Sequence, residues 1–240
     1  MARPDTRAEA LINAFAGEVQ AALGDALVCV VLHGSAAGDD WVADRSDVNT
    51  VVVAHRLTLD VLELLAPIVA RYRAQRFATP VLMDDAFVVR ARDAFPMELD
   101  DIHRQHRLLI GRDVFAALEV DRGALRTACE REARGKLLRL RALFLDFADR
   151  PEELERLMLE SLKTFLIVLR HLARLRGANP GESYRDVLRA GEAVLGPLPA
   201  MQRLLAHRDG QRLDAAKLRS EFGAYLTEVE RIVGIADAHA

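Results

Sequence analysis

Two segments that follow one another closely decide the fold of this chain: Leu32-His33-Gly34-Ser35 and Ser46-Asp47-Val48-Asn49-Thr50-Val51-Val52-Val53. The first ends an apolar run in a Gly-Ser turn, and the second is a β-branched run that carries Asp47 and Asn49 two residues apart. In an extended strand this spacing predicts that both polar side chains lie on one face, with Val48 on the other. The sequence therefore predicts a polar face beside a turn.

The Gly34-Ser35 turn has the residue types of a phosphate-binding turn. Glycine lets the backbone approach a ligand closely, and Ser35 is a good N-cap for residues 36–38. Backbone N–H groups at the start of such a helical turn can hold a phosphate. We therefore expect Gly34 and Ser35 to bind a nucleotide.

The turn, the loop and the polar pair together resemble the signature of the DNA polymerase β-like nucleotidyltransferase superfamily. In that superfamily two acids on the second strand hold two Mg²⁺ ions, which neutralise the charge that develops on the attacking and leaving oxygens. Gly34, Ser35 and Asp47 match the pattern, whereas Asn49 stands at the second acid position. An amide oxygen can ligate a metal, but it brings no charge and cannot act as a base. The resemblance implies a Mg²⁺ site at Asp47 and Asn49.

A third acid on a neighbouring strand is also part of the superfamily pattern. Residues 95–102, Phe-Pro-Met-Glu-Leu-Asp-Asp-Ile, alternate like a strand, which predicts that Glu98 and Asp100 share one face. Either of them is a candidate for the third catalytic acid, and Glu98 is a candidate metal ligand. The alternative is a charged edge strand facing solvent.

The composition is that of an ordinary globular protein without a strong charge bias. The chain has 240 residues, 51% of them apolar, and a net charge of −3. This balance gives no general attraction to nucleic acid or to an anionic membrane. Cys29 and Cys129 lie far apart without a metal-binding motif, so we expect buried free thiols. No leader-like segment and no stretch long enough to span a bilayer is evident, which predicts a cytoplasmic protein without a membrane partner.

The order of predicted elements divides the chain into an α+β domain over residues 1–120 and an all-α bundle over residues 121–240. The first is expected to hold a small mixed sheet with flanking helices. Its predicted helices span 5–23, 57–76 and 86–93, and its predicted strands span 26–32, 47–54, 79–83, 95–102 and 108–111. The bundle helices are predicted over 122–148, 151–176, 183–195, 200–207 and 213–236.

This layout resembles the aminoglycoside nucleotidyltransferases and the paired minimal nucleotidyltransferase and HEPN proteins of bacteria. The resemblance implies transfer of a nucleoside monophosphate, AMP from ATP, to an acceptor hydroxyl on a small molecule or protein. The alternative is a catalytically impaired nucleotide-binding or partner-binding protein whose bundle forms a homodimer. HEPN ribonucleases carry an Arg and a His at wider spacing than Arg203 and His207, so RNA cleavage is not expected.

Three further features each have a functional and a structural interpretation. The basic helix 126–141 can reach a triphosphate or form a solvated, ion-paired face. His103 and His106 can ligate a metal or form a surface pair. Trp41, in the loop between the two decisive segments, can cover a bound base or pack on the nearest helix.

Overall fold

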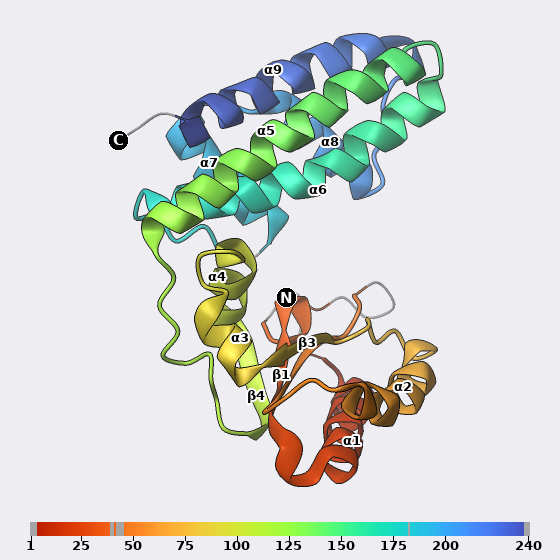
Figure 1. Cartoon of the computed structure of the whole chain (residues 1–240). Coiled ribbons are helices and arrows are strands. Elements are labelled where there is room, and N and C mark those ends of the chain that lie inside the picture. Colours follow the sequence, from red (N-terminus) through yellow and green to blue (C-terminus); the bar gives the residue numbers. More distant parts are fainter. Residues whose placement is uncertain (1–3, 39–40, 42–45, 182, 238–240) are drawn as a thin grey trace. The chain divides into compact units, whose positions relative to one another are not determined.

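The computed structural model describes residues 4–38, 41, 46–181 and 183–237 of the chain. They form two compact units, Met1–Asp121 and Arg122–Ala240 (Figure 1). The charged residues that the sequence places in the loop beside Trp41, namely Asp39, Asp40, Asp44 and Arg45, lie outside the described residues.

The first unit contains a four-stranded mixed sheet in the order β3-β2-β1-β4. The strands are β1 (Leu27–His33), β2 (Asn49–Ala54), β3 (Val81–Asp84) and β4 (His106–Gly111). β1 pairs antiparallel with both β2 and β4, whereas β2 and β3 are parallel. The α+β class expected from the sequence is therefore confirmed.

Apolar side chains bury both faces of the two central strands. On one face, Val30 and Val52 belong to a core cluster with residues of α1 (Thr6–Leu23) and α2 (Leu59–Arg73). On the other face, Val31 and Val53 pack with residues of α3 (Asp85–Arg90) and α4 (Pro96–Arg104). Burial on both sides explains why the sequence of these strands is an unbroken apolar run. Trp41 packs against the α1 and α2 cluster, as the structural interpretation of this residue requires.

Side-chain caps fix where the helices of this unit begin. Asp5 accepts a hydrogen bond from the Ala8 N–H at 2.8 Å, and Asp84 accepts one from the Phe87 N–H at 2.7 Å. Each carboxylate satisfies an N–H group that has no partner within the first turn. Pro67 lies inside α2 without ending it.

The strand predicted over residues 95–102 is wrong, because this segment forms α4. Pro96 occupies the first turn of the helix, where a residue without an N–H group removes no hydrogen bond. The buried residues of α4 are Pro96, Met97, Leu99, Asp100 and Ile102. Neighbouring residues are buried in pairs here, unlike the alternate residues on one face of a strand, so the two-residue alternation of polarity was accidental.

The second unit consists of helices and short 3₁₀ turns throughout its described residues. Its elements are α5 (Arg122–Phe147), α6 (Pro151–Leu175), α7 (Tyr184–Leu195), α8 (Pro199–Arg208), η3 (Ala215–Lys217) and α9 (Leu218–Asp237). A ring contact and a hydrogen bond join three of these helices: Phe144 stacks on Phe222 at 4.5 Å between ring centroids, and the Tyr225 hydroxyl lies 2.9 Å from that of Ser161. The helical region predicted from the sequence is confirmed.

Several basic side chains of helix α5 form ion pairs within the second unit. Arg126 and Arg134 both pair with Glu130, and Arg141 pairs with Glu230. These contacts fit the structural interpretation of this face. Arg203 and His207 are also engaged, with Glu221 and Glu155 respectively. None of the helices described is both long and apolar enough to cross a membrane.

Candidate functional site

The Gly34-Ser35 turn follows directly on β1 and has the backbone conformation that requires glycine. Gly34 has φ of 70°, in the left-handed region that side chains rarely adopt. It opens the 3₁₀ turn η2 (Gly34–Ala36), which the Ala37 N–H closes by donating to the Gly34 carbonyl at 2.9 Å. A Cβ atom at Gly34 would lie 3.5 Å from Nδ2 of Asn49, so the turn lies against the start of β2.

Asn49 and Asp47 are joined at the entrance of β2. Nδ2 of Asn49 donates to the main-chain carbonyl of Asp47 at 3.3 Å, which leaves Oδ1 as the acceptor end of the amide. β2 begins at Asn49, so Asp47 precedes the strand that was predicted to contain it. The Asp47 side chain is 61% exposed. The structure therefore brings Gly34, Asn49 and the main chain of Asp47 together at one end of the central strands β1 and β2.

Arg76 is a residue of this site that the sequence reasoning missed. Its guanidinium donates to Oδ1 of Asp47 at 3.3 Å. The sequence pattern predicted Arg76 as the last residue of the second helix, but α2 ends at Arg73. The chain then turns, and the Arg76 carbonyl accepts a hydrogen bond from the Val48 N–H at 2.9 Å.

Two histidines lie in line with Asn49 across neighbouring strands of the sheet. His33 is paired with Asn49 of β2 on one side and with His106 of β4 on the other. Burial lowers the pKa of His33, and the nearby Asp101 opposes this shift. His33 is therefore a mainly neutral imidazole beside the Gly34 turn near pH 7.

His103 and His106 each contact a main-chain carbonyl, and they do not form the surface pair given above as their structural interpretation. Nδ1 of His103 lies 2.8 Å from the Phe115 carbonyl, and Nδ1 of His106 lies 2.8 Å from the Ile102 carbonyl. Nε2 of His106 lies 2.9 Å from Asp113. Both rings are part-buried and tie α4 and β4 to the segment that follows β4.

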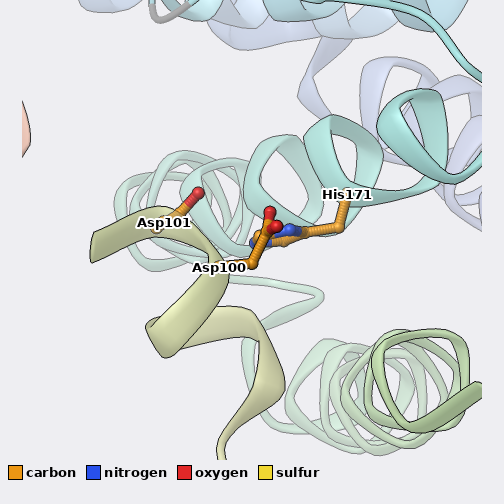
Figure 2. A group of neighbouring side chains, drawn as sticks. All are labelled: Asp100, Asp101 and His171. Carbon is orange, nitrogen blue, oxygen red and sulfur yellow. The ribbon is translucent and has the colours of Figure 1, made fainter. Parts of the chain in front are cut away.

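The structure separates Glu98 from Asp100 by turning their segment into a helix. Glu98 is exposed in the first turn of α4, whereas Asp100 is buried and accepts a hydrogen bond from Nε of Arg104 at 2.9 Å. Residues two apart on a helix point in nearly opposite directions. Figure 2 shows Asp100 and Asp101 on successive positions of α4, and His171 on α6. The assignment of Glu98 or Asp100 as the third acid stays a prediction.

Asp47 and Asn49 have the oxygen donors that suit a Mg²⁺ ion. Magnesium is commonly bound by one or two carboxylates together with phosphate oxygens of a substrate. Asp47 offers a carboxylate and Asn49 offers an amide oxygen, and the Asn49 amide lies beside the Gly34 turn. Among the residues that the structure describes, Asp47 belongs to no group of three potential His, Cys, Asp or Glu ligands.

Comparison with known proteins supports the fold over nearly the whole chain. No protein-family model and no curated protein sequence matches it. Among solved structures, it is similar to the spectinomycin adenyltransferase AAD(9) from Enterococcus faecialis, crystallised with ATP and spectinomycin. The TM-score is 0.59 and the identity 14%, and the match covers 96% of this chain and 99% of that one. The chain described here therefore shares the fold of that adenyltransferase over nearly its whole length.

Proposed function

We propose that this chain binds a nucleoside triphosphate at the Gly34-Ser35 turn and transfers its nucleoside monophosphate to an acceptor hydroxyl. ATP is the proposed donor, giving AMP transfer, and the acceptor is a small molecule or a protein. The observation that supports this best is the meeting of Gly34 and Asn49, 3.5 Å apart when a Cβ is placed on Gly34. This contact places the amide of Asn49 beside the turn that we propose binds phosphate.

The residues of the site divide the proposed work between them. The main-chain N–H groups of the Gly34 turn bind phosphate oxygens, which the absent side chain at Gly34 allows to approach. Asp47 and Asn49 hold a Mg²⁺ ion, which would stabilise negative charge on the transferred phosphoryl group. Glu98 or Asp100 is proposed as the third acid, which accepts the proton of the attacking hydroxyl.

A second candidate function is favoured by the contact between Asp47 and Arg76. The Arg76 guanidinium lies 3.3 Å from Oδ1 of Asp47, and Asn49 adds no second charge. A carboxylate that is already paired with a cation, beside a neutral amide, holds a divalent ion less tightly than two carboxylates do. On this basis the chain binds nucleotide without transferring it, and its helical unit forms the contact with a second copy or another partner.

A binding and transfer assay on the whole chain separates these functions. We expect ATP with Mg²⁺ to raise the melting temperature of the protein, and Asp47→Ala to remove most of the added effect of Mg²⁺. The exposed Asp93→Ala variant provides the control for loss of one carboxylate in the same unit. Transfer of labelled AMP to a panel of hydroxyl acceptors, spectinomycin included, is then measured.

Each outcome of this assay decides between the candidates. Labelled acceptor formed by the parent protein and lost in Asp47→Ala supports transfer. Nucleotide stabilisation without labelled acceptor supports the binding function. The absence of any shift with ATP, with and without Mg²⁺, would falsify the nucleotide site itself. Glu98→Gln and Asp100→Asn identify the third acid, since only the correct change reduces transfer without weakening ATP binding.

A further inference from the structure

Arg76 has a backbone conformation that is unfavourable for arginine. Its φ is 65°, and it is the only described residue other than glycine with a positive φ. Such conformations persist where the surrounding structure fixes them, and they concentrate at functional sites. Here the Arg76 N–H donates to the Arg73 carbonyl at 3.3 Å, and its carbonyl accepts from Val48 at 2.9 Å.

This conformation places the Cα and Cβ atoms of Arg76 beside the residues that precede β2. The Ala78 N–H donates to the Val48 carbonyl at 3.0 Å, so residues 76 and 78 form a bridge on both sides of Val48. From this position the guanidinium reaches Oδ1 of Asp47, and its side chain is 46% exposed. The backbone of Arg76 is therefore fixed by hydrogen bonds, and its side chain is partly exposed.

The positive charge of Arg76 lies against Asp47, at the proposed cation site. The Asp47 carboxylate that it contacts is the proposed cation ligand, and Asn49 next to it brings no charge. Guanidinium groups bind phosphate oxygens through two parallel N–H donors and stay charged at any physiological pH. A triphosphate held at the Gly34 turn and approaching Asp47 would meet this cation.

We propose that Arg76 is a triphosphate-binding residue that supplies part of the charge that divalent cations usually supply, so that this chain binds ATP without a metal. The inference rests on the proposed nucleotide site and specifies its ligand as a metal-free nucleoside triphosphate. Mg²⁺ at Asp47 and Asn49 then adds to the affinity, and it is not required for binding.

Calorimetric titration of the whole chain with ATP, in Mg²⁺ and in EDTA, tests this proposal. The parent protein is expected to bind in EDTA with a Kd within about tenfold of its Kd in Mg²⁺. Arg76→Asn is the main variant, because asparagine tolerates a positive φ and so preserves the backbone. It should weaken binding in EDTA by about 10- to 100-fold, as expected for the loss of hydrogen bonds to a charged group.

The ratio of the two dissociation constants distinguishes a binding role from a structural one. Loss of Arg76 should raise the EDTA-to-Mg²⁺ ratio, since Mg²⁺ can still bind Asp47, whereas general damage to the fold would weaken both. Arg76→Lys keeps a single charge and should fall between the parent and Arg76→Asn. Arg71→Gln is the matched control, because Arg71 is a nearby arginine in the last turn of α2 that pairs with Glu18.

The outcomes separate this inference from the proposed function. Binding by the parent protein in Mg²⁺ but not in EDTA overturns the role of Arg76 and keeps the nucleotide site. An unchanged ratio in Arg76→Asn, or an equal change in Arg71→Gln, overturns it too. If ATP does not bind in either condition, the nucleotide site and this inference both fail.

Discussion

Asp113 accepts a hydrogen bond from Nε2 of His106 at 2.9 Å, and its Oδ1 also accepts from the main-chain N–H groups of Phe115 and Ala116. Burial raises the pKa of Asp113, but the hydrogen bonds from His106 and the two N–H groups outweigh burial and leave the pKa below 3.8. One carboxylate thus connects the start of β4 to the segment after it.

We expect Asp113→Asn to reduce the acid sensitivity of the first unit. Because the folded-state pKa is lowered, ionised Asp113 stabilises the fold above its ordinary pKa of about 3.8, and this contribution is lost as the pH falls through the folded value. The variant should be less stable by about 1 kcal/mol at pH 7 and show a flatter decline below pH 4. Urea unfolding followed by the fluorescence of Trp41, the single tryptophan, reports on this unit. An equally steep acid decline in the variant would contradict the assignment.

Glu228 is expected to be a structural carboxylate of the second unit. It is buried, and its two oxygens accept from the N–H groups of Ala200 and Met201, at 2.7 and 2.8 Å, in the first turn of α8. Glu228→Gln would point an NH₂ group at one of these donors and should destabilise the protein by about 1–3 kcal/mol. Thermal unfolding followed by helical circular dichroism measures this. Glu230→Gln, on the same helix but half-exposed, is the control and should have a much smaller effect.

Gly191 allows α6 and α7 to pack closely. A Cβ atom there would overlap the end of the Leu169 side chain, which is buried. Gly191→Ala should therefore destabilise the protein by about 1–3 kcal/mol, although alanine is the better helix former. Gly223→Ala in α9 is the matched control, since nothing lies within 4 Å of its Cβ position. This control should be neutral or stabilising; equal effects at both glycines would exclude close packing as the cause.

Local signals in the sequence predicted most of the elements correctly. Asp84 and Ser183 cap the helices α3 and α7, because a short acceptor side chain before an amphipathic run satisfies the first N–H groups. The segment 95–102 was misread because eight residues of alternating polarity fit a strand and a helix about equally well. Pro96 was the available signal, since proline suits the first turn of a helix and disrupts a strand ladder.

Only part of the candidate site could be predicted from the sequence, and the reason is physical. Gly34 and Asn49 are brought together by the pairing of adjacent strands, which local sequence patterns can predict. Arg76 reaches Asp47 because α2 ends early and the chain turns through a left-handed conformation. No residue type marks that turn, since arginine is unfavourable there. Hydrophobic periodicity therefore could not predict a contact that depends on where a helix ends.

The last prediction concerns Asn49→Asp, which restores the second acid of the superfamily pattern. In the absence of metal, the new carboxylate replaces an amide that donates to the Asp47 carbonyl at 3.3 Å, and it adds a like charge near Asp47. We therefore expect a loss of stability on the order of 1 kcal/mol in EDTA. If the site transfers nucleotides, Mg²⁺ should restore that stability, tighten ATP binding and increase AMP transfer, because two carboxylates hold the cation. Asn49→Ala removes the amide without adding charge and controls for the lost hydrogen bond. Melting temperatures with and without Mg²⁺, together with the transfer assay, measure these effects. A variant that is less stable, gains no affinity for Mg²⁺ and labels no acceptor would exclude transfer and favour the binding function.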